Sequence, residues 1–310
     1  MVSVGGEQSS HQNNKVHIDM ATWAIINNPT SGSFRPDRLA AAVSVLRAEG
    51  IEVQQHPTER PGHATELAAS LTGVERILAH GGDGTLNEVA NGMLQRKGAG
   101  AGDVALAFLP GGTANGMAFE LGLPRNPAKA AQQLLKARPQ PVRPGMVNGR
   151  AFLLMAGFGF DGLAVYMVGK AVKSRLGAAA YLVMGVRALW HPKPVMRVTL
   201  PDGRQHQGVW VVGSRGRRYG GMFFIHPKAA LQAPDMGVTV VSKAMIAPFA
   251  FTHMLTGHGW RGGGINLPTA PNFRVESETP VYVQVDGEYL GQGNRFEVTQ
   301  SETALSFCMP

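Results

Sequence analysis

Glycines and one aspartate gather at residues 81–87, where the chain reads Gly-Gly-Asp-Gly-Thr-Leu-Asn. The run follows the apolar residues Ile77–Ala79 and precedes residues that favour a helix. A glycine turn between a strand and a helix places backbone N–H groups and a helix N-terminus against a phosphate. A carboxylate at such a turn repels a bare anion, so Asp83 indicates Mg²⁺ bound together with nucleotide phosphates. The alternative is an ordinary loop between a strand and a helix.

A second glycine turn lies at Gly111–Gly116. It too follows an apolar segment, Val104–Phe108, and precedes a helical pattern, Met117–Leu121. Turns at the ends of neighbouring parallel strands meet at the carboxyl edge of the sheet, where ligands bind. Neither turn contains the Gly-Lys-Ser/Thr of a Walker A loop, and neither fits Gly-x-Gly-x-x-Gly well. Together the two turns predict one nucleotide site.

Six short motifs stand in one order along the chain, and together they resemble a known family. They are Asn28-Pro29-Thr30-Ser31-Gly32, Thr58 with Gly62-His63-Ala64, residues 81–92, Gly112-Thr113-Ala114-Asn115, Gly157-Phe158-Gly159-Phe160-Asp161 and Val285-Asp286-Gly287-Glu288. With these motifs the chain is similar to the lipid kinases with a diacylglycerol-kinase catalytic domain, which include bacterial diacylglycerol kinases and sphingosine kinases. The resemblance implies ATP-dependent transfer of the γ-phosphate to a lipid hydroxyl. It also implies an α/β nucleotide domain followed by a β-sandwich, with the site in the cleft.

The resemblance implies a set of residues that hold ATP and Mg²⁺. Asp83 is expected at the metal–nucleotide complex. The nucleotide is expected to contact Asn28, Pro29, Thr30, Ser31, Gly32, Thr58, Gly81, Gly82, Asp83, Gly84, Thr85, Leu86, Asn87, Gly112 and Thr113. A simple turn at residues 28–32 is an alternative, as is a capping or turn role for Thr58 and Thr113.

Two acids near the end of the chain are the candidates for catalysis. Asp286 and Glu288 follow the apolar segment Val281–Val285, and similar enzymes use this pair. We expect Glu288 to accept the proton of the substrate hydroxyl and Asp286 to support it or bind metal, with exchanged roles as an alternative. A plain Asp-Gly hairpin turn is the other interpretation. Asp161 is expected to orient substrate or metal, or else to cap the helix that follows it.

Two segments depart from the family pattern. Asn115-Gly116 stands where many members have Asn-Asp, so one acid expected near the metal–nucleotide complex is missing. Residues 231–237 match a loop that holds a structural Mg²⁺ through several acids in some members, but here Asp235 is the only acid. One carboxylate, a Gln oxygen and a carbonyl make a poor Mg²⁺ site. We therefore expect the Asp235 site to be degenerate.

The composition is that of a globular chain with two domains. Of 310 residues, 44% are hydrophobic and 16% charged, and the one cysteine, Cys308, cannot form an internal disulfide. This suits a reducing compartment. Residues 1–20 are polar without a signal pattern, and no apolar run reaches the roughly 18 residues of a membrane span. We expect a disordered leader and a cytoplasmic protein.

The formal charge of +8 is unevenly distributed. Residues 170–218 hold ten Lys or Arg against one acid, Asp202. This stretch predicts peripheral contact with anionic lipid headgroups, and a solvated surface is the alternative. We expect no nucleic-acid partner, because no RNA- or DNA-binding motif is present and aromatic residues are sparse.

The pattern of elements changes near residue 143. In residues 21–143, strands alternate with helices, which predicts a Rossmann-like α/β domain with a parallel sheet. The predicted strands are 23–26, 51–53, 76–79 and 104–109, and the predicted helices are 37–48, 64–71 and 127–137. Residues 144–310 predict an antiparallel β-sandwich for the lipid substrate. Its predicted strands are 194–200, 208–213, 237–242, 281–285 and 295–299, and its predicted helices are 163–190 and 247–256. The resemblance implies that the last strand returns to the first domain.

Other functions remain open. NAD kinase carries a similar glycine turn, although the continuation Asn87–Gly92 and the late Asp-Gly-Glu are typical of the lipid group. A catalytically weak lipid- or nucleotide-binding protein is another class, motivated by Asn115-Gly116 and the thin Mg²⁺ loop. His80 is a candidate for phosphate contact, with a structural role as the alternative, and the histidines show no metal signature. The sequence specifies neither the lipid nor the oligomeric state.

Overall fold

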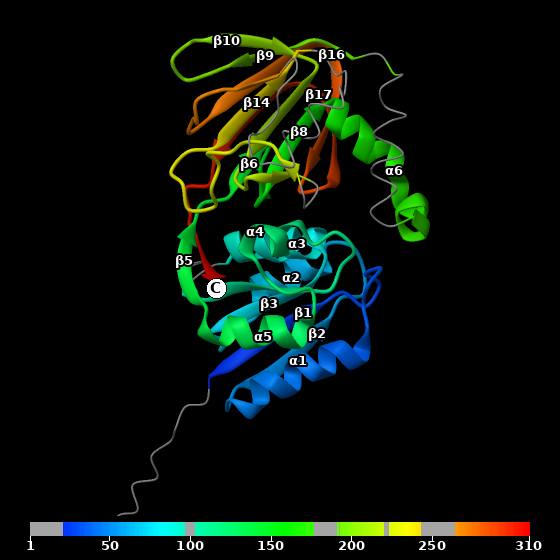
Figure 1. The fold of residues 1–310 in the computed structure, drawn as a ribbon, viewed down its shortest axis with the longest axis vertical. Helices are drawn as coiled ribbons and strands as arrows, with labels where there is room; N and C mark the ends of the chain where they lie inside the picture. The colour runs from blue at the N-terminus through cyan, green and yellow to red at the C-terminus, as the bar shows by residue number, and fades with distance from the viewer. Residues whose placement is uncertain (1–20, 97–102, 177–190, 192, 220–222, 243–263) are drawn as a thin grey trace, which may run out of the picture.

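The structure, a computed structural model, describes residues 21–96, 103–176, 191, 193–219, 223–242 and 264–310. These residues form two domains stacked along the long axis of the molecule (Figure 1). The lower domain in that view is α/β, and the upper one is an antiparallel β-sandwich.

The α/β domain is built on a sheet that has six strands in the described residues, in the order β2-β1-β3-β4-β18-β5. The strands are β1 (Thr22–Asn27), β2 (Glu52–Pro57), β3 (Arg76–Gly81), β4 (Ala105–Pro110), β5 (Arg138–Val142) and β18 (Leu305–Met309). Neighbours pair in parallel except β18 with β5. Every residue of β4 is buried, as expected for a parallel strand covered on both faces.

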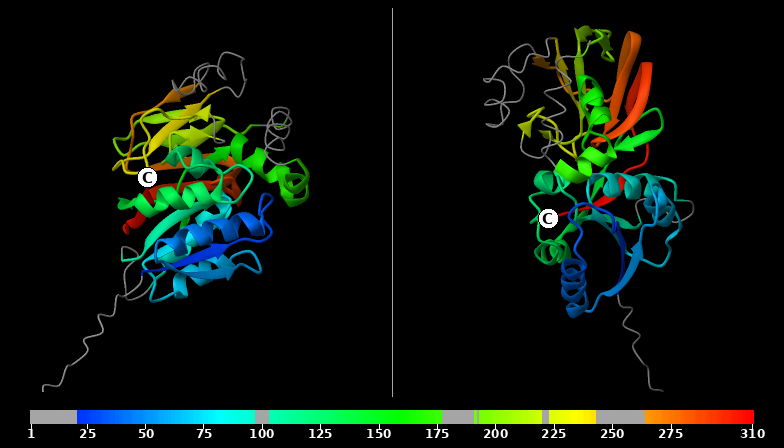
Figure 2. Two further views of the ribbon diagram at one scale, coloured as in Figure 1. Left: turned by 60° about the horizontal axis from the view of Figure 1, so that its bottom comes forward. Right: turned by 90° about the vertical axis from the view of Figure 1, so that its right-hand side faces the viewer.

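Helices cover both faces of this sheet (Figure 2). The helices are α1 (Pro36–Ala48), α2 (His63–Ser70), α3 (Asp83–Leu94), the short α4 (Gly116–Leu121) and α5 (Pro127–Lys136). α1 packs with α5, and α2 packs with α3. The predicted parallel sheet wrapped by helices is confirmed.

Two edge strands differ from the predictions. β2 runs through the polar residues Gln54–His56 to Pro57, whereas the predicted strand ended at Val53. β5 was not predicted, because its sequence Arg-Pro-Gln-Pro-Val looks like a linker. Proline lacks an N–H and is tolerated at the edge of a sheet, which is where β5 lies.

The second domain is the predicted antiparallel β-sandwich, whose described strands form one ten-stranded network. They are β6 (Gly145–Val147), β7 (Arg150–Phe152), β8 (Met155–Gly159), β9 (Met196–Thr199), β10 (Gln205–Gly208), β11 (Trp210–Ser214), β14 (Gly237–Val241), β15 (Gly264–Asn266), β16 (Phe273–Val285) and β17 (Glu288–Gln300). β12 (Arg218–Tyr219) pairs separately with β13 (Phe223–Phe224).

The long strand β16 connects two parts of the network. It pairs with β9 over Arg274–Ser277 and with β8 over Val283–Val285. Its register to β17 shifts between Glu276 and Val281, and such an irregularity bends a strand. The predicted strands 281–285 and 295–299 are parts of longer strands, β16 and β17, which together form one long hairpin.

Helix α6 (Phe160–Leu176) follows β8 and begins at Phe160 rather than at Leu163. The remainder of that predicted helix, the predicted helix 247–256 and the predicted leader 1–20 lie outside the described residues. In the part of the chain that is described, no helix combines the length and the apolar character needed to cross a membrane.

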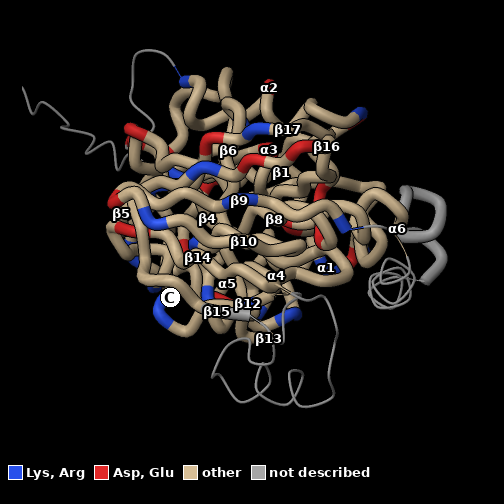
Figure 3. Tube along the Cα trace, turned by 90° about the horizontal axis from the view of Figure 1, so that it is seen from above, with Lys and Arg blue, Asp and Glu red and all other residues tan. Residues whose placement is uncertain are grey.

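Charges of both signs are interspersed over the described trace when the molecule is viewed from above the sandwich (Figure 3). Part of the basic stretch 170–218 lies outside the described residues. Within it, Arg204 pairs with Asp202 at 2.6 Å, and Arg215 is only 1% exposed. Arg215 therefore does not belong to any surface that attracts lipid headgroups, which corrects the prediction for that residue.

The strand β18 lies between β4 and β5 although it is distant from both in sequence. Its Phe307 is fully buried and pairs with Leu106 of β4. Figure 1 shows the red end of the chain entering the lower domain. The late strand thus completes the core of the first domain.

We expect Phe307→Ala to lower the free energy of unfolding by about 3–5 kcal/mol, because it removes a buried aromatic side chain and leaves a cavity. Chemical denaturation of the full chain measures this. Ser306→Ala on the same strand is the control and should change the free energy by less than about 0.5 kcal/mol. Equal stabilities of the two variants would show that β18 contributes nothing to the core.

Candidate functional site

The two glycine turns meet at the carboxyl edge of the sheet, as predicted. Gly111 N donates to Gly81 O at 2.8 Å. A Cβ built on Gly112 would lie 2.4 Å from the Cα of Gly82, closer than real Cβ atoms approach backbone. Only glycine therefore fits at this crossing, and the backbone of both turns can approach a ligand closely.

The loop at residues 28–32 lies against both turns. Asn28 N donates to His80 O at 2.9 Å, and Ser31 Oγ donates to Gly111 O at 2.9 Å. Thr30 N and Oγ1 both donate to Asn28 Oδ1. The proposed turn role and the nucleotide role are thus compatible, since the internal hydrogen bonds hold the loop at the site.

Thr58 and Thr113 lie at the same edge. Thr58 follows β2, and its N–H donates to Asn27 O at 2.8 Å. Thr113 faces the loop, because a Cβ on Gly32 would lie 2.9 Å from Thr113 Oγ1. The structure brings these segments together, as the motif order implied.

The Asp83 carboxylate has a structural partner that the sequence did not indicate. Its oxygens accept hydrogen bonds from Gly116 N at 2.8 Å and Met117 N at 2.9 Å, so Asp83 joins the two turns at the start of α4. A bound metal is therefore not the only explanation for this acid. An ionised carboxylate has about four lone-pair sites, so these bonds are compatible with a nucleotide-bound cation.

The side chains of Leu86 and Asn87 are both buried, while the predicted contact of the residue 81–87 amides with phosphate stays a prediction. Leu86 is in the hydrophobic core. Asn87 Nδ2 donates to Ala151 O and to Asp286 Oδ2, both at 2.8 Å. One turn further along α3, Asn91 Oδ1 accepts from Ala151 N at 3.0 Å. The two asparagines therefore join α3 to the second domain.

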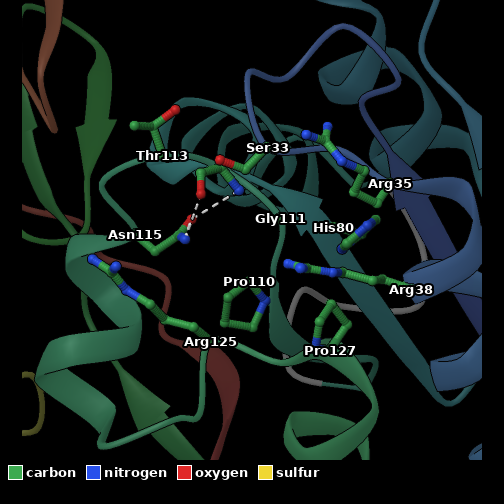
Figure 4. A pocket seen from close by; sticks show the side chains of 11 residues that line it. Ser33, Arg35, Arg38, His80, Pro110, Gly111, Thr113, Asn115, Arg125 and Pro127 are labelled. Carbon is green, nitrogen blue, oxygen red and sulfur yellow. Dashed lines mark hydrogen bonds between the residues drawn. The ribbon is translucent and has the colours of Figure 1, made fainter. Parts of the chain in front are cut away.

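A cavity of about 160 Å³ lies beside the Gly111–Thr113 turn (Figure 4). Arg35, Arg38 and Arg125 line it, and none of the described lining residues is acidic. Guanidinium groups around backbone amides suit a phosphate chain. The sequence did not single out these arginines. Arg35 and Arg38 lie at the start of α1, whereas Arg125 lies in the loop before α5, and no spacing pattern connects them.

His80, which also lines this cavity, has a structural role. Its Nδ1 lies 3.0 Å from Leu109 O, and because a carbonyl oxygen only accepts, Nδ1 carries the proton. Burial lowers the pKa of His80, and the hydrogen bond to Leu109 opposes that shift. A neutral imidazole already bonded to the backbone is a poor anion ligand, so the structural alternative is favoured.

The Asp-Gly pair forms the tip of the β16–β17 hairpin. Asp286 has a φ of 48° and Gly287 a φ of 82°, the positive values that a tight hairpin turn of this kind requires. The hairpin interpretation of this pair is therefore correct. It does not exclude a functional role, because the turn brings Glu288 to the other domain.

Asp286 is buried and fully bonded. Oδ1 accepts from Leu154 N at 2.8 Å and Met155 N at 3.0 Å, and Oδ2 accepts from Leu153 N and Asn87 Nδ2, both at 2.8 Å. Burial raises the pKa of Asp286, and these hydrogen bonds oppose the shift. Because every partner donates, the ionised carboxylate fits this cradle. Asp286 thus supports the hairpin, and the exchanged role, with Asp286 as the base, has no support.

Glu288 differs from Asp286 in being exposed. A Cβ on Gly84 would lie 2.9 Å from Glu288 Oε1, so the carboxylate lies directly against the first glycine turn. The two acids therefore have separate positions, one inside the hairpin and one at its surface beside the turn.

Asp161 is 2% exposed and forms part of an internal chain of hydrogen bonds. Tyr219 Oη donates to Asp161 Oδ1 at 2.5 Å, and Gln284 Nε2 donates to Asp161 Oδ2 at 2.6 Å. Gln284 Oε1 in turn accepts from Gly287 N at 2.7 Å. The expected contact with substrate and the expected helix cap are not supported, because Asp161 instead holds the hairpin from within.

The loop around Asp235 does not fit a metal ion. No group of three or more His, Cys, Asp or Glu that could hold a metal occurs among the described residues. Carbonyl oxygens of the loop accept hydrogen bonds from the Arg215 guanidinium instead. The degenerate site at Asp235 stays a prediction.

The structure thus combines an α/β domain that carries two glycine turns with a β-sandwich whose hairpin brings an acid, Glu288, against the first turn. This is the architecture of a two-domain kinase. Residues 22–147 match the model of the diacylglycerol kinase catalytic domain, and residues 155–303 match that of the YegS C-terminal NAD kinase beta sandwich-like domain. The chain belongs to the lipid kinase family that carries this catalytic domain.

Relatives span nearly the whole chain. It is 31% identical to a diacylglycerol kinase of Bacillus subtilis (strain 168), covering 86% of this chain and 89% of that protein. It is also 31% identical to a "Probable lipid kinase YegS-like" protein of Pseudomonas aeruginosa (strain UCBPP-PA14), over 88% and 90%. A crystal structure of a diacylglycerol kinase from Bacillus anthracis str. Sterne shares the fold, with a TM-score of 0.70, 21% identity and coverage of 94% and 97%.

The two hairpin acids should respond differently to removal of their charge. Asp286→Asn should lower the free energy of unfolding by about 1–3 kcal/mol or more, because an NH₂ group then faces backbone N–H donors. Glu288→Gln, at the exposed position, should change it by less than about 0.5 kcal/mol. Denaturant melts of both variants measure this, and a stable Asp286→Asn protein would contradict the cradle described above.

Proposed function

We propose that the chain transfers the γ-phosphate of ATP to the hydroxyl of a membrane lipid, with Glu288 as the general base. The observation that carries this proposal is the position of Glu288. A carboxylate from the sandwich lies against Gly84, inside the turn whose amides would face phosphate. A base must lie within reach of the proton it accepts, and the hairpin would bring the Glu288 carboxylate close to the bound nucleotide.

The nucleotide would occupy the edge formed by the two glycine turns and the loop at residues 28–32. Turn amides would donate to phosphate oxygens, and Arg35, Arg38 and Arg125 would neutralise their charge from the adjoining cavity. Asp83 would hold a nucleotide-bound Mg²⁺. Such an ion would neutralise charge that develops on the phosphates during transfer.

The reaction itself needs one proton transfer. The lipid hydroxyl oxygen attacks the γ-phosphorus and forms a new O–P bond. The bond from that phosphorus to the β-bridging oxygen breaks, and ADP leaves with its electron pair. The hydroxyl proton passes to Glu288, while Asp286 and Asp161 keep the hairpin in place from within.

A tyrosine cluster on the β16–β17 hairpin and α6 supports a lipid acceptor. Tyr166, Tyr282 and Tyr289 form a cluster with ring centroids 5.0–6.2 Å apart, and Tyr166 and Tyr289 are 51% and 41% exposed. Tyrosine has an apolar ring and a polar tip, which suits the interface between membrane and water. We propose that this tyrosine cluster meets the bilayer while the site receives the hydroxyl, which makes the protein a peripheral membrane enzyme.

A product assay tests the proposed reaction against the alternatives. Labelled ATP is offered with diacylglycerol, a sphingoid base, a ceramide-like lipid and NAD, and products are identified by mass. We expect a phosphorylated lipid, and a loss of about 10²–10⁴ in turnover for Glu288→Gln with unchanged ATP affinity, because a base acts in the transition state. Phosphorylated NAD would favour an NAD kinase, and ATP binding without product would favour a binding protein.

The tyrosine cluster predicts a dependence on how the lipid is presented. Tyr166→Ser with Tyr289→Ser should weaken vesicle binding and vesicle-based turnover by about tenfold, equivalent to about 1.4 kcal/mol. Turnover of a short-chain lipid dissolved in water should be retained. Val195→Ser, at a 57% exposed apolar position, is the control and should behave like the parent. Equal losses on both substrates would place the tyrosines in the chemistry rather than at the membrane.

A further inference from the structure

Arg215 is the most unusual charged residue in the described part of the chain. It follows β11 and is 1% exposed. A buried charge is costly unless it is hydrogen-bonded or paired, and in the described part of the chain no carboxylate lies within salt-bridge distance of this guanidinium. Its partners are carbonyl oxygens of a single loop.

Those carbonyls come from the loop between Leu231 and Asp235. Arg215 Nη2 donates to Leu231 O at 2.7 Å and to Ala233 O at 2.8 Å, and Nη1 donates to Asp235 O at 3.1 Å. Pro234 O, in the same stretch, accepts from Gln300 Nε2. A ring of carbonyl oxygens on a tight loop is the arrangement that hard cations bind.

The guanidinium remains charged at neutral pH. Burial lowers the pKa of Arg215 to about 10, and the nearby Asp235 carboxylate opposes that shift. The loop therefore surrounds a permanent positive charge that is covalently part of the chain.

We propose that the Arg215 guanidinium is the resident cation of the 231–235 loop, so that this chain needs no structural Mg²⁺ where similar kinases are expected to hold one. A divalent ion at the same carbonyls would lie next to the guanidinium and be repelled by it. The single acid of the loop could not offset that repulsion. This explains why the loop tolerates the loss of the acids that a metal would require.

The same residue connects the loop to the catalytic hairpin. Arg215 N and Gly216 N donate to Leu154 O at 2.8 and 3.1 Å, and Leu154 N donates to Asp286 Oδ1 at 2.8 Å. Asp286 forms the hairpin tip that carries Glu288. The guanidinium anchors this backbone to the 231–235 loop, so Arg215 is a positioning residue for the segment that cradles Asp286.

Thermal melts of the nucleotide-free protein test the metal inference without any kinase assay. The parent and Asp235→Asn are each melted in EDTA and in MgCl₂, and the Mg²⁺ content after dialysis is measured by mass spectrometry. We expect no stoichiometric Mg²⁺ and the same Mg²⁺-induced shift in Tm for both proteins. A larger shift in the parent, or one bound Mg²⁺ that Asp235→Asn removes, would overturn the proposal.

Variants of the arginine give a second, independent measure. Arg215→Met keeps much of the side-chain length but leaves the carbonyls without donors, so Tm should fall by roughly 5 °C or more. Arg217→Met is the matched control, since Arg217 has a 49% exposed side chain and contacts Glu120 at 3.5 Å. Its Tm should equal that of the parent. Equal Tm values for Arg215→Met and Arg217→Met would overturn the role of Arg215.

If Arg215→Met does not fold, Arg215→Lys replaces it, because a lysine keeps the charge with a different donor geometry. Its Tm should lie below that of the parent and should still not respond to Mg²⁺. A Tm equal to that of the parent would show that the forked guanidinium is not needed.

The positioning role rests on the proposed function and has its own measurement. Below the melting range, Arg215→Lys should lower kcat while the KM for ATP is unchanged. A change in KM alone would overturn the positioning role. Failure of the kinase reaction itself would leave the melts and the metal analysis unaffected.

Discussion

The buried carboxylate of Asp286 is the interaction on which the relation between the two domains depends. It lies inside the second domain, yet one of its hydrogen bonds comes from Asn87 of the first. Removing an ionised group from water costs several kcal/mol unless its partners are complete. Any movement that separates α3 from the segment Leu153–Met155 would leave this charge with too few donors. The domains are therefore fixed relative to each other at the point where the hairpin approaches the glycine turn.

Much of the GGDGTLNEVANG motif holds the protein together, within the first domain and between the two domains, rather than contacting a ligand. The side chains of Asn87 and Asn91 bond to β7 and to the hairpin, and Glu88 Oε1 accepts from Gly62 N at the start of α2. Gly92 allows α3 to contact α2 closely, since a Cβ there would lie 2.2 Å from Thr65 O. The first half of the motif shapes the nucleotide edge, and the second half assembles the protein around it. A motif typical of a family can thus record domain assembly as well as chemistry.

The sequence predicted those features that depend on local pattern. The alternation of strands and helices, the meeting of the glycine turns and the Asp-Gly hairpin all follow from neighbouring residues.

The features that could not be predicted depend on contacts between residues far apart in the chain. Nothing near Asp286 indicates that it is buried while Glu288, two positions later, is exposed. Nothing in the basic stretch distinguishes Arg215 from Arg217, because burial is decided by the loop that folds over only one of them. The hydrogen bonds from the Gly116 and Met117 amides to Asp83 could not be predicted either, because the approach of that turn cannot be deduced from spacing.

The position of β18 has a consequence for how the protein is made. On a ribosome, β1 to β4 emerge first, but the place between β4 and β5 stays empty until Leu305–Met309 has been synthesised. Until then β4 presents unpaired backbone groups and an apolar edge, which is the kind of surface that pairs with other chains. The first domain therefore cannot reach its final form during translation of its own segment. The edge of β4 therefore stays available for pairing with other chains until the last strand has been made.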